Sequence, residues 1–421
     1  MTFSGLMLAT CLAMAADAPH SVTTIEARLA KKPTGDEAAD LVKTLRGMLS
    51  KQADLTLGMS SPPKAGRKVL WFIEAPDAQS VKVVGSEGSA WPLQEIDQSE
   101  VFAAVVEVPN VFEAKFHYDV DGEKRGGGDL RVEEFPLGPD SQKQPGVPQG
   151  KLLEMGEWRS NIYEGTSRSW WVYVPAQYDP REGACVMFFQ DGEWYAKGDG
   201  NACIVFDNLI HQKKIPPIIG VFVNPGVYPG KGPEKGRSSR SDEYDTCTPR
   251  YAEFLEKEIL AEVAKQFKLK DDPKCRAICG ISSGGSCAFT AAWHRPDLFS
   301  RVLSHVGSFC DFRPVGKYPT LDNGNPPKVE DPATWKVAHD YPPLIRKTQP
   351  RKPLRVFLQA GSRDLDNTLG NWPLANEQMA AALRYAGYPH RYVRGDGFHS
   401  KSHGMSILPE SLVWLWSETA E

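Results

Sequence analysis

The segment Gly280–Gly284, which reads Gly-Ile-Ser-Ser-Gly, matches the pattern G-x-S-x-G and could present a serine hydroxyl for nucleophilic attack. In such an elbow the serine occupies a tight turn between a strand and a helix, and glycines stand where side chains would collide with neighbouring backbone. Ser282 has glycine both two residues before and two residues after it, whereas Ser283 does not. A strand-like apolar run over 275–281 precedes the motif and a helix-like run over 285–295 follows it. We therefore predict that Ser282 is a nucleophile.

A serine hydroxyl is a weak nucleophile at its own pKa, so a base must accept its proton and a carboxylate must orient that base. In a strand, turn and helix context of this kind the acid and then the base follow the serine along the chain. Asp364 comes shortly after the strand-like run 354–360 and is the preferred acid, with Asp366 as the alternative. His399 directly follows Gly-Phe and is the preferred base, with His403 as the alternative.

The tetrahedral intermediate of acyl transfer needs backbone N–H donors for its oxyanion. One donor is expected after the nucleophile, at Ser283, and a second in the loop that follows an early strand. The run 185–190 is strand-like and leads into Asp-Gly-Glu-Trp, so Gly192 is the candidate for the second donor. Asp191 precedes the serine in the chain, and we expect it to make structural hydrogen bonds rather than to act as the acid.

Three residues that precede a predicted helix, Arg240, Glu243 and Tyr244, are candidates to line a substrate pocket. A structural ion pair is the alternative interpretation for this group. Two other histidines, His294 and His305, belong to the helix after the elbow and to the next strand, where we expect packed side chains.

A metal site is not expected. His399 and His403 have a spacing that could suit a metal, but the flanking glycines and lysine indicate a loop, and no third ligand is evident. The chain has eight cysteines and no CxxC pair, and Cys275 and Cys279 stand on one face of a strand without a histidine cluster. We expect buried free thiols, with one disulfide as the alternative.

These residues must be held by a framework of strands and helices. Strand-like and helix-like segments alternate after residue 150, which predicts an α/β domain with a mostly parallel sheet covered on both faces. The predicted strands cover 169–175, 185–190, 218–224, 275–281, 302–308, 354–360 and 390–395, and the predicted helices cover 250–267, 285–295 and 375–387.

The first part of the chain differs in character. Short β-rich runs separated by Gly, Pro, Asp and Ser predict a small β-sandwich, and "APDAQSVKVVG" and "FHYDVDG" resemble immunoglobulin-like early-set modules. The predicted domains are a signal peptide over 1–18, a helical segment over 19–62, the immunoglobulin-like sandwich over 63–135, a linker over 136–150 and the α/β domain over 151–421.

Net charge and the distribution of apolar residues indicate which kinds of partner and which cell compartment to expect. The 421 residues carry a formal net charge of −4, which argues against nucleic-acid binding. An apolar stretch over 5–15 followed by small residues is typical of a signal peptide, so we expect a periplasmic or extracellular protein; a buried N-terminal segment is the alternative. Because no run reaches the length of a membrane helix, we expect no membrane insertion.

Several motifs in this order, among them "FFQDGEWY", "CGISSGGSCAFTAAWHRPDLFSRVLSHVGSF", "LQAGSRDLDN" and "GDGFHSKSHGMSILPESLVWLW", resemble the enterochelin-esterase and esterase-D-like family of α/β-hydrolases. That family includes feruloyl and acetyl-xylan esterases. The resemblance implies ester hydrolysis by Ser282, Asp364 and His399 without a cofactor, on a small-molecule or glycan ester: an acylated carbohydrate, a related natural ester or a siderophore ester.

The sequence departs from the family's pattern at two places, an insertion or remodelled lid over 313–344 and Phe398, where relatives usually carry a second glycine. Two alternative functions are compatible with the same sequence features. One is acyl transfer to a sugar acceptor by the same residues, and the other is a catalytically inactive glycan-binding protein.

Overall fold

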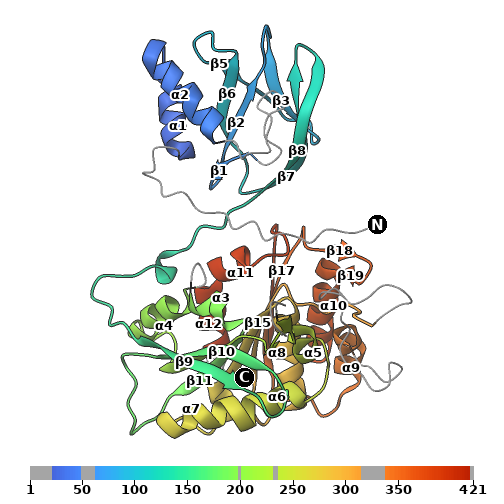
Figure 1. The fold of residues 1–421 in the computed structure, drawn as a ribbon. Helices are drawn as coiled ribbons and strands as arrows, with labels where there is room; N and C mark the ends of the chain where they lie inside the picture. Colours follow the sequence, from blue (N-terminus) through green and yellow to red (C-terminus); the bar gives the residue numbers. More distant parts are fainter. Residues whose placement is uncertain (1–20, 49–61, 198–200, 231–235, 314–336, 418–421) are drawn as a thin grey trace. The chain divides into compact units, whose positions relative to one another are not determined.

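The chain divides into two compact units, Met1–Glu134 and Phe135–Glu421. The structure is a computed structural model that describes residues 21–48, 62–197, 201–230, 236–313 and 337–417 (Figure 1). The predicted signal peptide over 1–18 and most of the predicted insertion over 313–344 lie outside the described residues. The sandwich and linker boundaries drawn from the sequence stay predictions.

The described part of the first unit begins with two helices that pack on one face of a sheet. Ser21 caps the first helix, because its side chain accepts a hydrogen bond from the Thr24 amide at 3.1 Å. Ile25 and Leu41 are fully buried against Phe72 of the sheet. The helices are α1 (Val22–Leu29) and α2 (Gly35–Gly47).

The described part of this unit also holds two antiparallel four-stranded sheets, in the orders β1-β2-β6-β5 and β4-β3-β7-β8. Trp71, from one sheet, contacts Phe116 and Tyr118, from the other, in a shared core, and Trp91 stacks on Trp71 at 5.6 Å between ring centroids. These aromatic residues therefore serve packing; an immunoglobulin-like topology stays a prediction. The strands are β1 (Lys64–Ala65), β2 (Lys68–Glu74), β3 (Val81–Gly85), β4 (Ala90–Pro92), β5 (Gln94–Glu95), β6 (Val101–Glu107), β7 (Val111–Val120) and β8 (Glu123–Glu133).

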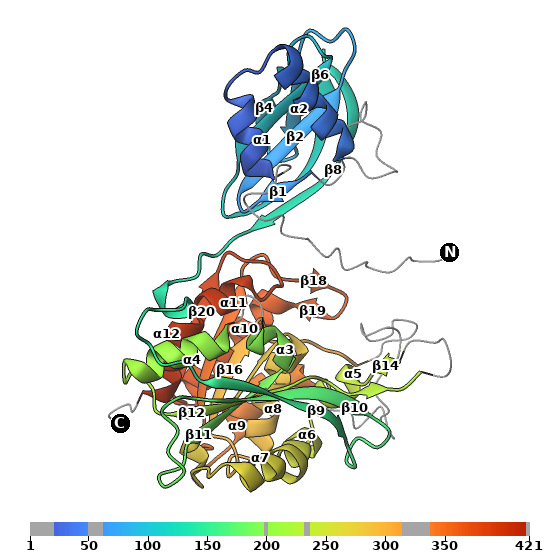
Figure 2. The same cartoon turned by 60° about the vertical axis from the view of Figure 1, so that its left-hand side comes forward.

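The second unit is built on one mixed sheet, with ten strands in the described residues (Figure 2). Neighbouring strands run parallel in the order β12-β11-β15-β16-β17-β20, while β10 joins β12 antiparallel and β9 pairs with β10. The strands are β9 (Lys151–Arg159), β10 (Ser167–Val174), β11 (Cys185–Gln190), β12 (Ile218–Val223), β13 (Val227–Tyr228), β14 (Arg237–Ser238), β15 (Arg276–Ile281), β16 (Arg301–His305), β17 (Arg355–Gly361) and β20 (His390–Gly395).

Side chains along each strand alternate between two apolar layers. In β11, Val186 and Phe188 join one core cluster, and Met187 and Phe189 join the other. The second layer is covered by α3 (Gly192–Ala196), α4 (Ala202–His211), α11 (Ser402–Ser406) and α12 (Leu408–Trp416). The first is covered by α5 (Arg240–Tyr244), α6 (Arg250–Phe254), a π-helical turn over Leu255–Leu260, α7 (Ala261–Gln266), α8 (Ser283–His294), α9 (Tyr341–Lys347) and α10 (Trp372–Tyr385).

Two further properties of the described residues bear on the earlier expectations. Their seven cysteines are free thiols, and burial raises the pKa of Cys247 to about 12, so that it stays protonated at neutral pH. Within the same residues, no helix combines the length and the apolar character that crossing a bilayer requires.

Candidate active site

Ser282 occupies the turn between β15 and α8, with φ at 58° and ψ at −126°. A positive φ is uncommon for a residue other than glycine. Strand β16 and the loop after it hold this conformation, because the Ser282 amide donates to the His305 carbonyl at 2.9 Å and the Ser308 amide donates to the Ser282 carbonyl at 3.0 Å. The backbone at Ser282 is therefore fixed on both its N–H and C=O sides.

Two glycines near Ser282 lie in close contact with neighbouring atoms. A Cβ atom on Gly280 would lie 2.2 Å from the carbonyl oxygen of Gly284. A Cβ atom on Gly285 would lie 2.6 Å from the Ser304 hydroxyl. The first clash involves backbone and cannot be relieved by a side-chain rotation, so the strand can pass this closely under the first turn of α8 only with glycine at position 280.

Ser282, His399 and Asp364 form a continuous chain of hydrogen bonds. The Ser282 Oγ atom lies 2.8 Å from His399 Nε2, and His399 Nδ1 lies 2.5 Å from Asp364 Oδ1. The Asp364 side chain is fully buried, while the His399 side chain is 21% exposed. A buried carboxylate on Nδ1 favours the tautomer that leaves Nε2 free to accept the serine proton.

The loops that carry Asp364 and His399 are joined directly. The Arg363 amide donates to the Gly397 carbonyl at 3.0 Å, and the Ser362 amide donates to the Gly395 carbonyl at 2.8 Å. A Cβ atom on Gly361 would lie 2.1 Å from the Gly397 carbonyl oxygen. Because β17 and β20 are parallel neighbours, their carboxyl ends place these two loops side by side.

The alternative acid and base have other neighbours. Asp366 is exposed and belongs to a two-residue strand, β18 (Asp366–Asn367), which pairs with β19 (Gly370–Asn371). His403 lies in α11, where its Nδ1 atom is 3.1 Å from Gln359 Nε2 and its ring stacks on Phe135. The structure thus brings Asp364 and His399, and not these alternatives, into the hydrogen-bond chain with Ser282.

Of the remaining histidines singled out in the sequence, His305 is packed as expected. The prediction of a packed side chain at His294 is wrong, because this last residue of α8 is exposed. His305 is fully buried, and its Nδ1 atom lies 3.0 Å from the Tyr195 hydroxyl. Burial, with a smaller contribution from His403, lowers the pKa of His305 to about 3. His294 Nε2 lies 3.1 Å from the Cys247 carbonyl oxygen. Neither residue takes part in the chain around Ser282.

The two predicted oxyanion donors both begin helices. Ser283 is the first residue of α8, and the amides of a first helical turn have no acceptor within their helix. Gly192 is the first residue of α3, where a Cβ atom would lie 2.3 Å from the Val223 amide nitrogen. The next amide, that of Glu193, donates to the Asn224 side chain at 3.0 Å. The oxyanion role of Ser283 and Gly192 stays a prediction.

Asp191 connects the loop before α3 to the elbow through Arg240. The Arg240 guanidinium donates two hydrogen bonds to the Asp191 carboxylate, each at 2.9 Å, and a longer one to the Ile281 carbonyl at 3.4 Å. The Asp191 amide donates to the Tyr244 hydroxyl at 3.2 Å. Asp191 therefore makes the structural hydrogen bonds expected of it.

The three candidate pocket residues differ in exposure. Glu243 pairs with Arg168 at 2.6 Å, with both side chains fully buried, and also accepts from the Gly226 amide at 3.0 Å. Tyr244 is 1% exposed, so neither it nor Glu243 offers side-chain surface to a substrate. The Arg240 side chain is 21% exposed. Substrate contact stays a prediction for Arg240.

Two residues near Ser282 were missed by the sequence reasoning. Ser308 Oγ lies 3.2 Å from Ser282 Oγ, and Trp372 Nε1 donates to Ser308 Oγ at 3.1 Å. The Trp372 ring also meets the His399 ring edge to face, at 5.7 Å between centroids. The sequence analysis gave neither residue a role. Ser308 ends the predicted strand 302–308, inside one of the segments that resemble the family, and Trp372 has no comparable signal.

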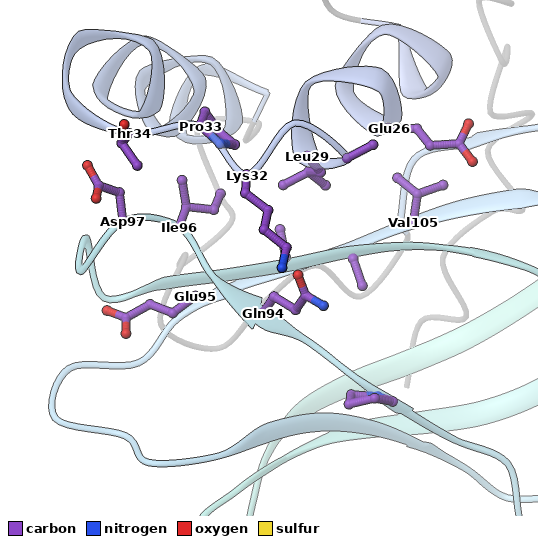
Figure 3. A pocket seen from close by; sticks show the side chains of 14 residues that line it. Glu26, Leu29, Lys32, Pro33, Thr34, Gln94, Glu95, Ile96, Asp97 and Val105 are labelled. Carbon is purple, nitrogen blue, oxygen red and sulfur yellow. The ribbon is translucent and has the colours of Figure 1, made fainter.

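A separate cavity of about 560 Å³ lies in the first unit, between the turn that joins α1 to α2 and the strands β5 and β6. The Lys32 side chain extends into it towards Gln94 (Figure 3). Its lining contains no serine, cysteine or histidine, so it holds no arrangement like that of Ser282 and His399. Elsewhere too, the described residues contain no group of three or more His, Cys, Asp or Glu side chains that could hold a metal ion.

The sequence of the second unit matches a known family. Residues 162–412 match the esterase family described as "Putative esterase". The chain belongs to this family. The match covers the strands and loops that carry Ser282, Asp364 and His399, and the predicted resemblance to enterochelin esterases is confirmed.

The curated relatives align with only part of their own length. The chain is 22% identical over 303 residues to the iron(III) enterobactin esterase of Dickeya dadantii, an alignment that covers 69% of this chain and 62% of the relative. It is 24% identical over 182 residues to the enzyme of the same name from Escherichia coli K12, covering 43% of this chain and 41% of the relative. It is 25% identical to an endo-1,4-beta-xylanase/feruloyl esterase of Xylanibacter ruminicola, covering 54% of this chain and 33% of the relative.

Solved structures confirm the α/β-hydrolase-like fold with its mixed sheet. The enterobactin esterase of Shigella flexneri with 2,3-dihydroxy-N-benzoylserine has a TM-score of 0.53 and 17% identity, with 83% of this chain and 93% of that chain covered. The ferric enterobactin esterase of Salmonella typhimurium has the same TM-score, identity and coverage. At this identity the likeness shows the fold alone.

Proposed function

We propose that this protein is a serine carboxylic-ester hydrolase in which Ser282 is the nucleophile, His399 the general base and Asp364 the residue that orients His399. The observation that carries the proposal is the unbroken chain of hydrogen bonds from Ser282 Oγ through His399 to the buried Asp364 carboxylate. The positive φ of Ser282 supports it, because strained backbone conformations gather at functional sites. Family membership supports the reaction class.

The reaction follows from these contacts. His399 Nε2 accepts the Ser282 proton as Oγ forms a bond to the ester carbonyl carbon, and the Ser283 amide stabilises the oxyanion. His399 then gives this proton to the departing alcohol as the carbon–oxygen bond breaks, which leaves an acyl group on Ser282. A water molecule, activated by His399, releases the acid and restores the hydroxyl.

The proposed substrates are acylated carbohydrates, such as feruloyl and acetyl esters, related natural esters, or siderophore esters. The names of the relatives support both classes, since one group acts on enterobactin and another carries a feruloyl esterase. Hydrolysis rates of the purified protein on a catecholate siderophore ester, a feruloyl sugar and an acetyl sugar would rank them. If the protein hydrolysed none of the three esters, this substrate assignment would be contradicted.

The proposed nucleophile is tested with a matched pair of serine variants. Ser282→Ala should abolish p-nitrophenyl acetate turnover and labelling by a fluorophosphonate probe while the melting temperature is retained. Ser286→Ala is the control, because its hydroxyl is buried in α8, the helix that follows Ser282, and donates to the Ser283 carbonyl at 3.0 Å. Turnover and labelling that persist in Ser282→Ala would refute the proposal.

A further inference from the structure

A second serine continues the hydrogen-bond chain on the far side of the nucleophile. Trp372 Nε1 lies 3.1 Å from Ser308 Oγ, which lies 3.2 Å from Ser282 Oγ, which lies 2.8 Å from His399 Nε2. Asp364 Oδ1 ends the chain, 2.5 Å from His399 Nδ1. Ser282 Oγ therefore lies between two hydrogen-bond partners rather than one.

The two ends of this chain fix the direction of every hydrogen bond in it. The indole N–H of Trp372 can only donate, and an ionised Asp364 carboxylate can only accept. His399 must then donate from Nδ1 and accept at Nε2, so the Ser282 hydroxyl donates to His399. The Ser308 hydroxyl, which accepts from Trp372, has Ser282 Oγ as the acceptor for its own proton.

We propose that Ser308, held by the indole of Trp372, is a positioning residue for the nucleophile: its hydroxyl donates to Ser282 Oγ and keeps the Ser282 proton directed at His399. This inference rests on the proposed function of Ser282. Because Ser308 donates and never loses its proton to Ser282, its hydrogen bond also stabilises the negative charge that develops on Oγ as His399 accepts the serine proton.

The backbone between β16 and Ser308 is shaped for this contact. β16 ends at His305, and Val306 follows with φ at 41°, a conformation in which a β-branched residue is rare. The turn returns the chain towards the elbow, where the Ser308 amide donates to the Ser282 carbonyl at 3.0 Å. Ser308 therefore contacts Ser282 through both its backbone and its side chain.

Helix α10 anchors the same loop from the other side. The Asn376 side chain donates to the Gly307 carbonyl at 2.9 Å and to the Trp372 carbonyl at 3.0 Å. Ser308 and Trp372 are each 1% exposed, so bulk water does not compete for the hydrogen bond between them. Trp372 also packs edge to face on the His399 ring, and one side chain thus contacts both partners of Ser282.

Ser308→Ala tests the proposal directly. One neutral hydrogen bond corresponds to roughly a threefold to tenfold change in rate, so we expect kcat to fall by about that factor while KM stays within about twofold. The matched control is Ser304→Ala, which removes a buried hydroxyl from β16 itself. If Ser308→Ala and Ser304→Ala have the same kcat, the proposal is overturned.

Trp372→Phe tests the other half of the chain, because it keeps an aromatic ring and removes the N–H donor. We expect a fall in kcat in the same direction. The Ser308→Ala/Trp372→Phe double variant should have a kcat no lower than that of the poorer single variant, because the indole N–H acts through Ser308. Losses that multiply in the double variant would show that Trp372 acts on the reaction independently of Ser308, against the proposal.

A stability cycle separates this inference from the proposed function. If the wild-type protein hydrolyses no ester and takes up no fluorophosphonate, the proposed function fails. The melting temperatures of Ser282→Ala, Ser308→Ala and the double variant then still test the contact. A hydrogen bond between the two hydroxyls makes the two shifts non-additive. If the melting-temperature shifts of the two single variants add up to that of the double variant, the proposed hydrogen bond is refuted, whether or not the protein is active.

Discussion

The Nε2 atom of His399 lies 2.8 Å from the Oγ atom of Ser282, although 117 positions separate the two residues. The parallel sheet accounts for this contact. Ser282 follows β15 and His399 follows β20, and both strands end at the same edge of the sheet. Chemistry at this edge therefore depends on loops that are distant in the sequence. Each loop offers a second candidate residue, so paired variants can test the choice between them.

Replacing His399 should remove the base. His399→Gln is expected to lower kcat by about 10³-fold or more, since no other described side chain lies within hydrogen-bond distance of both Ser282 and Asp364. The paired variant His403→Gln should keep kcat within a few fold, because His403 contacts Gln359 and Phe135. Steady-state kinetics on p-nitrophenyl acetate measure both, and a larger loss in His403→Gln would reverse the assignment.

The acid can be separated from its alternative in the same way. Asp364→Asn keeps the shape of the side chain but removes the carboxylate acceptor on His399 Nδ1, so the imidazole can take the wrong tautomer. A fall in kcat of about 10³-fold to 10⁴-fold is expected. Asp366→Asn, on an exposed two-residue strand, should leave kcat unchanged. Equal activity of the two variants would contradict the role of Asp364.

Glu243 should matter for stability. Glu243→Gln leaves the buried Arg168 guanidinium without its counter-charge, which typically costs about 3–5 kcal/mol of unfolding free energy. The control is Asp179→Asn, because Asp179 pairs with an Arg181 side chain that is 87% exposed, and water screens such a pair so that its loss should change stability little. Urea denaturation measures both. A Glu243→Gln protein as stable as the wild type, with a raised KM, would instead favour substrate contact.

His305 should make stability sensitive to acid. Its pKa is lowered to about 3 in the folded state by burial, whereas an unfolded histidine titrates near 6.5. Between these two pKa values the unfolded chain binds more protons than the folded one. The contribution of His305 to the unfolding free energy is therefore fully present above about pH 6.5, and it falls towards pH 3 by up to about 1.4 kcal/mol per pH unit. His305→Gln should show a shallower loss of unfolding free energy on acidification, measured by urea denaturation from pH 7 to pH 4. A parallel loss in both proteins would rule out this contribution.

Local patterns predicted the framework of the second unit well. The runs 185–190, 218–224 and 354–360 are mostly apolar because both faces of a parallel strand are buried, and they appear as β11, β12 and β17. The strand predicted over 302–308 is shorter in the structure. It ends at His305 because Val306 has a positive φ, a conformation that a β-branched residue rarely adopts.

The site was predicted only where chain order and glycine spacing carry information. Gly280 and Gly284 mark Ser282 by their spacing: backbone packs too closely on Gly280 for a Cβ atom, and a Cβ atom on Gly284 would lie 3.1 Å from the Asp191 carboxylate. Ser308 and Trp372 carry no such mark, because their roles depend on contacts between segments that the sheet brings together. Glu243 was a candidate pocket residue because it lies ahead of a predicted helix. Its buried ion pair with Arg168, 75 positions away, matches the alternative interpretation.

The loops after β17 and β20 share two backbone hydrogen bonds and a contact in which Gly361 meets Gly397. For protein engineering, the segments 361–364 and 395–399 thus form a single transferable cassette. If only one of these segments is taken from a homologue, a foreign loop must pack against a native one at the contact between Gly361 and Gly397, where a Cβ atom on Gly361 has no room. Libraries that recombine members of this family should therefore place no crossover between these segments.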